Sequence, residues 1–115
     1  EYHCLLDQSA LLSLCHANHL ALTAYSPLGK GRLAEEPTLA RIGARHGATA
    51  SQVALAWLLR QEGVAAIPKA SRPESQRANL EALAVPLDAA DLAAIAALPK
   101  DRRFVNPAFA PDWAA

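Results

Sequence analysis

The sequence has few cysteines, few aromatic residues and no excess of charge of either sign. Two cysteines, Cys4 and Cys15, are too few for a disulfide scaffold, so we expect reduced, buried thiols in a cytoplasmic protein. Eleven Lys and Arg balance eleven Asp and Glu, which argues against nucleic acid or an anionic membrane as a partner. No apolar run reaches about 18 residues, so no segment is expected to span a bilayer.

Alanine and leucine dominate what is present. The chain of 115 residues is 52% hydrophobic and only 19% charged, which excludes intrinsic disorder. Its 27 alanines and 18 leucines favour helix over strand, because these side chains lose little entropy in a helix. The apolar pattern begins almost at Glu1, with neither a Met nor a polar lead-in. We therefore expect a cut end there.

Apolar spacing and stop signals predict helices that alternate with a few short strands. The expected strands cover residues 20–25 and 64–67, each stopped by a proline, with a possible third strand over residues 1–3. Helices are predicted over residues 8–18, 37–47, 49–63 and 88–98, together with one that carries Asn79, Leu80 and Leu83. Residues 29–32 are expected to form a flexible basic turn.

Residues typical of helix N-termini predict where four of these helices begin. Thr49 and Gln52 have the spacing of a capping box, and Pro37 suits a first helical position. The helix that carries Asn79 begins either at Ser71, with a capping box to Glu74, or at Pro73 as its first residue. Asp88 and Asp91 are best explained as charges at a helix N-terminus. The sequence leaves the choice between Ser71 and Pro73 open.

The alternation of strands and helices predicts an α/β fold with parallel pairing. Two or three short strands make too small a sheet to cover several amphipathic helices. We therefore expect a helix-rich part of a larger (β/α)8 barrel of roughly 250 residues or more, incomplete as given.

Two loops that follow strands are the candidate sites, because ligands of parallel α/β folds gather at the C-terminal ends of strands. Residues 68–72 combine a lysine, a hydroxyl and an arginine with a helix start, which suits an anion such as phosphate. The alternative is a solvated basic loop. Tyr25, in the loop at 25–29, either offers a ring face to a ligand or packs as an ordinary aromatic.

Motifs of other chemistries are missing from the sequence. It holds no GxGxxG fingerprint, no P-loop and no GxSxG elbow. His3 and Cys4, and the group of Cys15, His16 and His19, lack metal-ligand spacing, so no metal is expected. Trp57 is expected in the core, whereas Trp113 is either packed or part of a lid.

Several linked motifs resemble the C-terminal half of the aldo-keto reductases. These are residues 23–29 (TAYSPLG), 46–47 (HG), 52–58 (QVALAWL) and 66–71 (AIPKAS), followed by Asn79 and Leu80. The opening EYH at 1–3 resembles the segment after the sixth barrel strand of that family. The tail at 106–113 (NPAFAPDW) is similar to the bacterial branch that includes 2,5-diketo-D-gluconate and methylglyoxal reductases.

The resemblance implies a (β/α)8 barrel that reduces aldehydes and ketones with hydride from NADPH. Tyr25 matches the tyrosine that stacks on nicotinamide, and the loop from Ser26 through Leu28 and Gly29 matches the one along the pyrophosphate. Lys69 matches the lysine that pairs with the 2′-phosphate, with Ser71 and Arg72 beside it, and Asn79 matches the adenine contact.

Two departures concern the 2′-phosphate. Ala70 stands where the family usually has Ser, and Ser75 stands where it usually has Arg. Arg72 or Arg77 would replace the lost guanidinium, which grips phosphate in a planar fork. We expect a preference for NADPH, with some use of NADH.

The catalytic tetrad of the family lies in the N-terminal half of the barrel, which this chain does not contain, and Tyr2 is not its tyrosine. No residue here is therefore expected to be catalytic. Residues 1–115 are interpreted as the C-terminal portion of a reductase for keto-sugars or dicarbonyls. The missing N-terminal half would complete the barrel. Residues 99–115 form its tail loop, with Trp113 as the candidate substrate contact. The alternative is a remnant without catalysis, which binds nucleotide or only packs against a partner half-barrel.

Overall fold

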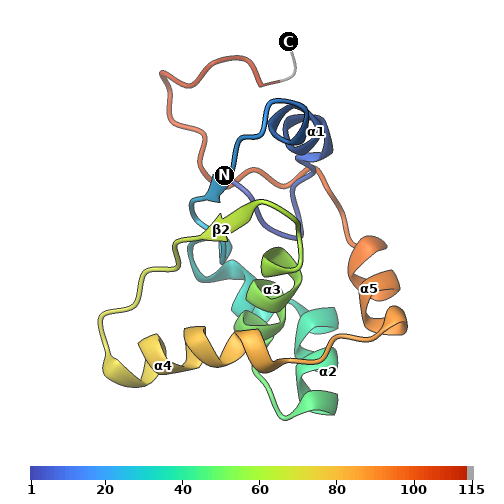
Figure 1. Cartoon of the computed structure of the whole chain (residues 1–115). Coiled ribbons are helices and arrows are strands. Elements are labelled where there is room, and N and C mark those ends of the chain that lie inside the picture. Colours follow the sequence, from blue (N-terminus) through green and yellow to red (C-terminus); the bar gives the residue numbers. More distant parts are fainter. Residues whose placement is uncertain (114–115) are drawn as a thin grey trace.

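The computed structural model describes residues 1–113 and consists mainly of helices around a small parallel sheet (Figure 1). The helices are α1 (Ser9–Ala17), α2 (Pro37–His46), α3 (Ala50–Leu59), α4 (Pro73–Glu81) and α5 (Ala89–Ala96). The strands are β1 (Leu22–Ala24) and β2 (Val64–Ala66), and two short 3-10 helices are η1 (Gly29–Glu35) and η2 (Ala82–Ala84). The predicted alternation of helices and strands is confirmed.

The sheet pairs β1 with β2 in parallel, with Leu22 opposite Val64, and the connection runs through η1, α2 and α3. The third strand expected at residues 1–3 was wrong, because the chain bends into a turn at His3. One backbone hydrogen bond of this segment reaches the residue that follows β1, from Tyr2 N–H to Tyr25 O at 3.4 Å. A single bond does not make a ladder.

The predicted helix starts are confirmed, and the open choice is resolved. Thr49 and Gln52 form the capping box of α3, and Pro37 begins α2. Helix α4 begins at Pro73, and its N-cap position has no side-chain cap, so the Ser71 capping box does not form. Helix α3 ends at Leu59, short of the predicted Gly63.

The turn expected at residues 29–32 lies within η1, where Lys30 and Gly31 have positive, non-helical φ values. Lys30, Gly31 and Arg32 are exposed, whereas the residues on either side of them, Gly29 and Leu33, are buried. Leu33 is fully buried, and Gly29 has a positive φ of 56°. A Cβ on Gly29 would lie 2.8 Å from the ring of Phe104. The positive φ and the close packing against the C-terminal tail therefore require glycine at position 29.

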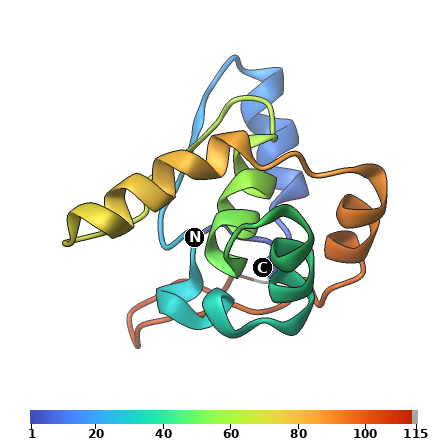
Figure 2. The same cartoon turned by 90° about the horizontal axis from the view of Figure 1, so that it is seen from below.

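Helix α3 lies at the centre of the molecule (Figures 1 and 2). Its buried face, with Val53 and Leu58, contributes to two apolar clusters, and the half-buried Trp57 packs against both. Cys4 and Cys15 are free and buried, as the sequence predicts. Burial raises the pKa of Cys4 to about 12, which leaves this thiol protonated at neutral pH.

Several leucines on the helices lie open to solvent. Leu14 on α1 is 59% exposed, and Leu80 and Leu83 are each 71% exposed. Helix α4 projects from the rest of the molecule in both views (Figures 1 and 2). Within residues 1–113, no helix combines the length and apolar composition that a membrane crossing needs.

Candidate functional site

The loops that follow β1 and β2 lie side by side, because parallel strands end at the same edge of the sheet. The pairing continues one step past the strands, where Ile67 N–H donates to Ala24 O at 3.2 Å. Leu28 from the first loop and Lys69 from the second line two neighbouring hollows, of about 380 and 370 Å³. The structure therefore brings together the two loops that the sequence singled out.

The hollow of about 370 Å³, here called the basic groove, holds most of the predicted cofactor residues. They are Leu28, Lys69, Ser71, Arg72 and Asn79. Ser75 also lines the groove, whereas Arg77 does not. Lys69 and Arg72 are both exposed, and no carboxylate is among the lining residues. Two cations with hydroxyl and amide groups suit a phosphate-bearing ligand.

Gln52 is a groove residue that sequence reasoning treated only as a helix cap. Its Oε1 accepts from Thr49 N–H at 2.9 Å, while its Nε2 donates to Ala78 O at 3.0 Å. Gln52 therefore links the start of α3 to α4 by a hydrogen bond between two residues that line the basic groove, Gln52 and Ala78. The capping-box spacing located this side chain, but no sequence signal indicated its second bond.

The first loop holds the other predicted residues in a strained turn. Ser26 has a positive φ of 48° and lines the hollow of about 380 Å³ together with Leu28. Gly29 is buried below the loop and is not among the residues that line these hollows. Its cofactor contact stays a prediction.

Tyr25, at the end of β1, is 38% exposed and lines a third hollow of about 350 Å³, here called the tail hollow. The other lining residues all come from the C-terminal tail and are Val105, Pro107, Phe109, Ala110, Pro111 and Trp113. Trp113 is packed as well as exposed to the hollow, since its Nε1 donates to Asn106 Oδ1 at 3.0 Å. Trp113 is 48% exposed and is held within the tail by this bond, and its role as part of a lid stays a prediction.

Tyr2, the other tyrosine, lies away from these hollows in the core. It is 5% exposed, and its ring meets Trp57 edge-on, with the ring centroids 5.7 Å apart. Burial raises the pKa of its hydroxyl. A buried phenol of raised pKa is no candidate for proton transfer to a bound ligand.

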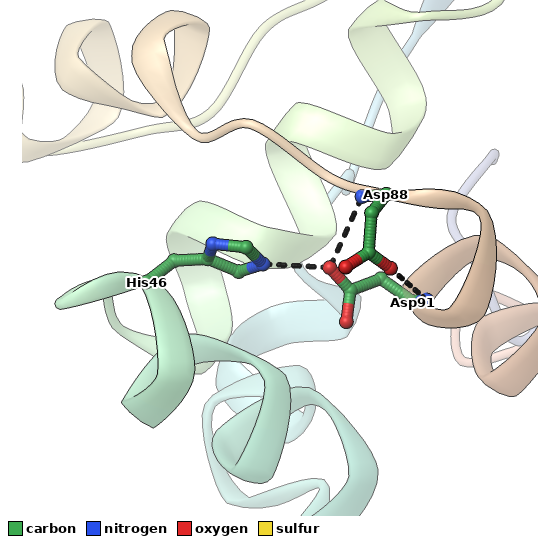
Figure 3. Close-up of side chains that lie close together, drawn as sticks. All are labelled: His46, Asp88 and Asp91. Atoms are coloured by element: carbon green, nitrogen blue, oxygen red, sulfur yellow. Dashed lines mark hydrogen bonds and ion pairs between the residues drawn. The ribbon is translucent and has the colours of Figure 1, made fainter.

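Among residues 1–113, one group of side chains has donor atoms close enough to hold a metal, namely His46, Asp88 and Asp91 (Figure 3). Its hydrogen bonds show another purpose. Asp91 Oδ2 accepts from His46 Nε2 at 2.6 Å and from Asp88 N–H at 3.1 Å, while Asp91 Oδ1 accepts from Arg45 Nη1 at 2.7 Å. The buried carboxylate is therefore fully bonded and already paired with a cation.

These contacts dock the C-terminal end of α2 on the N-terminal end of α5. Asp88 and Asp91 also form the capping box of α5, which confirms the interpretation of both as helix N-terminal charges. The hydrogen bond from Asp91 N–H and the Arg45 guanidinium hold the pKa of Asp88 below its usual value. This cluster is structural and lies apart from the basic groove.

The model of the Aldo/keto reductase family matches residues 1–100 of this chain. The chain belongs to this family. Methylglyoxal reductase DkgB of Escherichia coli O157:H7 is 41% identical to it over 109 residues, which cover 94% of this chain and 40% of that protein. The NAD(P)H-dependent D-xylose reductase XYR1 of Pyricularia oryzae is 34% identical over 122 residues, which cover 94% of this chain and 37% of that protein.

Solved aldo-keto reductase structures share this fold. A protein assigned as a 2,5-diketo-D-gluconic acid reductase B superposes over the whole chain with a TM-score of 0.91 and 36% identity, and 42% of that protein is covered. An aldo-keto reductase complexed with NADPH superposes with a TM-score of 0.82 and 30% identity. The match covers 93% of this chain and 36% of that protein. This aldo-keto reductase chain spans about two fifths of its relatives and matches part of their α/β barrel.

Proposed function

We propose that this chain is the C-terminal, cofactor-binding portion of an NADPH-dependent aldo-keto reductase, with residues 99–115 as its tail loop. The observation that carries the proposal is the basic groove, in which Lys69 and Arg72 lie beside Leu28 of the neighbouring loop. Lys69 and Arg72 follow β2, and the exposed ring of Tyr25 follows the neighbouring strand β1. Cations and an aromatic ring at adjacent strand ends suit the phosphate and the nicotinamide of one dinucleotide.

The residues present fit NADPH in chemistry and in order along the strand ends. Lys69 and Arg72 would hold the 2′-phosphate, and Asn79, on α4, would contact the adenine. The turn at Ser26 and Leu28, with Gly29 beneath it, would lie along the pyrophosphate, while Tyr25 offers its ring face to the nicotinamide. Bound NADPH supplies the hydride for carbonyl reduction. A relative named as NAD(P)H-dependent and a related structure complexed with NADPH support this assignment.

Arg72 is the better candidate for the guanidinium that the family usually has six positions after the lysine. It lines the basic groove beside Lys69, whereas Arg77 lies on α4 outside the lining. A guanidinium binds phosphate through a planar fork, so a location in the groove favours Arg72 over Arg77. Ser71 and Ser75 add hydroxyl groups to the same groove.

The proposed substrates are small aldehydes and ketones, of the keto-sugar or dicarbonyl class. Relatives named as methylglyoxal reductase and 2,5-diketo-D-gluconic acid reductase support this class. Trp113 in the tail hollow is the candidate contact. We assign no residue of this chain to proton transfer, and we place that chemistry in the remainder of the barrel.

The proposal is tested by measuring the binding of NADPH and NADH to the full-length natural polypeptide. The change in cofactor fluorescence gives the two Kd values. Lys69→Ala and Arg72→Ala should each raise the Kd for NADPH about tenfold or more and leave the Kd for NADH nearly unchanged. Arg77→Ala, which removes a guanidinium from α4 outside the groove, is the matched control. Equal effects of Lys69→Ala on the two cofactors would refute the phosphate site.

Turnover separates an enzyme from a remnant that binds nucleotide without catalysis. The full-length polypeptide should oxidise NADPH when methylglyoxal is added, at a rate that saturates with the carbonyl compound. Tight NADPH binding without any carbonyl-dependent oxidation would favour the remnant.

A further inference from the structure

The carboxylate of Glu1 is fully buried and holds the root of the C-terminal tail. Its Oε1 accepts from Phe104 N–H at 2.9 Å, and its Oε2 accepts from Val105 N–H at 3.0 Å. His3 Nε2 donates to Oε1 at 2.9 Å. Burial raises the pKa of Glu1, but these hydrogen bonds outweigh it and hold the pKa below its usual value. Glu1 therefore binds the tail as a charged acceptor.

The side chain of Phe104 is clamped at the same place. Its ring stacks on that of His3, with centroids 5.2 Å apart, and the Arg32 guanidinium lies 4.8 Å from the centroid of the Phe104 ring. The missing side chain of Gly29 makes room for this ring. Backbone and side chain of one tail residue are thus both fixed, and the direction in which the tail leaves is set.

From this root, residues 105–113 run without helix or strand to the tail hollow. Arg103 continues the connection, because its Nη1 lies 3.9 Å from Glu1 Oε2 and its guanidinium lies 4.1 Å from the ring centroid of Trp113. On the opposite wall, the N–H of Tyr2 donates to the carbonyl of Tyr25. The segment that begins with Glu1 therefore contacts both walls of the tail hollow.

We propose that Glu1 is a positioning residue that sets the gap between Tyr25 and the aromatic tail, and thereby the affinity for the carbonyl substrate. It acts through the tail and not on the basic groove, because the backbone groups that its carboxylate binds belong to Phe104 and Val105, and neither residue lines the groove. The statement about substrate rests on the proposed reductase function. The statement about the tail stands on the contacts alone.

Glu1→Gln in the full-length natural polypeptide is the test, because glutamine keeps the shape but has one acceptor oxygen instead of two. Trypsin should cleave after Arg102 or Arg103 about tenfold faster than in the wild-type polypeptide, as measured from the intact mass of the products. The KM for the carbonyl substrate should rise about tenfold, while the Kd for NADPH stays unchanged. Glu62→Gln, which alters an exposed carboxylate before β2, is the matched control and should change none of these.

A second variant shows whether Glu1 acts through the tail. Trp113→Ala alone should raise the KM, and adding Glu1→Gln should raise it little further, because both changes open the same wall. Additive effects, an equal loss of NADPH affinity, or unchanged trypsin cleavage would overturn the proposal. If Glu1→Gln does not fold, Arg103→Ala must still raise the KM without changing the Kd for NADPH. A wild-type polypeptide that reduces no carbonyl would refute the proposed function, while the trypsin comparison would still decide whether Glu1 anchors the tail.

Discussion

Tyr25, at the end of β1, and Trp113, near the end of the chain, line the same hollow of about 350 Å³. The two residues lie far apart in the sequence, and they share this hollow because the C-terminal tail runs back past the N-terminal segment (Figure 1). In the proposed reductase, the tyrosine faces the cofactor and the tryptophan faces the substrate. Variants of the two residues should therefore differ in which ligand they weaken.

Trp113→Ala should raise the KM for small carbonyl substrates about threefold to tenfold and leave the Kd for NADPH unchanged. Tyr25→Ala should weaken both ligands, because it removes the ring proposed to stack on nicotinamide. Tyr25→Phe keeps that ring and is the control. Steady-state kinetics and cofactor fluorescence provide the two readouts, and a loss of NADPH affinity in Trp113→Ala would contradict this division.

Ser75→Arg should strengthen binding of NADPH. Ser75 lines the basic groove with Lys69 and Arg72, so an arginine there adds a third cation at the proposed 2′-phosphate site. We expect the Kd for NADPH to fall about tenfold and the Kd for NADH to stay constant. Ser75→Ala is the control for loss of the hydroxyl. A gain in affinity shared equally by the two cofactors would place the phosphate elsewhere.

Asp91→Asn should destabilise the docking of α5 on α2. Asp91 is fully buried and accepts hydrogen bonds from Arg45, His46 and the Asp88 N–H. We expect the free energy of unfolding, measured with urea, to fall by about 2–3 kcal/mol. Asp101→Asn, at an exposed carboxylate, should change it by less than about 0.5 kcal/mol. EDTA should leave the wild-type melting temperature unchanged, and a zinc-dependent rise would favour a metal site instead.

The burial of His3 and the hydrogen bonds of Glu1 predict a loss of stability in acid. Burial holds the pKa of His3 below its usual 6.5, so folding favours the neutral ring, and its contribution is complete above pH 6.5 and decreases as the pH falls below it. Glu1 has a pKa below its usual 4.5, so its contribution is lost further down, as the pH falls through 4.5. The free energy of unfolding should therefore decrease from pH 6.5 downwards. His3→Gln should flatten the curve between pH 6.5 and 5, and an unchanged slope would contradict the assignment.

Residues 1–115 expressed alone should self-associate. Leu80 and Leu83 are each 71% exposed, and Leu14 on α1 is 59% exposed. Among the described residues, the sheet has only two strands, so each strand has one edge without a strand partner. Exposed apolar faces and open strand edges favour association between chains. Light scattering after gel filtration would test this, and a monomer with a sharp cooperative melt would contradict it.

Local structure was predictable wherever the physical cause lies within a few residues. Thr49 and Gln52 bond each other's backbone across one turn, and Pro37 has the backbone angle of a first helical position, so both helix starts could be read directly. The strands could be read as well, because Pro27 and Pro68 stop them. Whether Ser71 or Pro73 begins α4 depended on a loop whose direction is set by β2, and only the structure decided it.

The convergence of distant groups depended on tertiary structure. The sequence by itself determined the family motifs, the basic character of residues 68–72 and the aromatic tail. Only the fold placed Arg72 in the groove and Arg77 outside it, and only the fold brought Asp91 to His46 and Glu1 to Phe104. Sequence spacing does not predict which group a carboxylate will bind, because hydrogen bonds depend on distance in space and not on separation along the chain. The sequence therefore determines the kinds of chemistry available, and the packing of α2, α5 and the tail determines which groups meet.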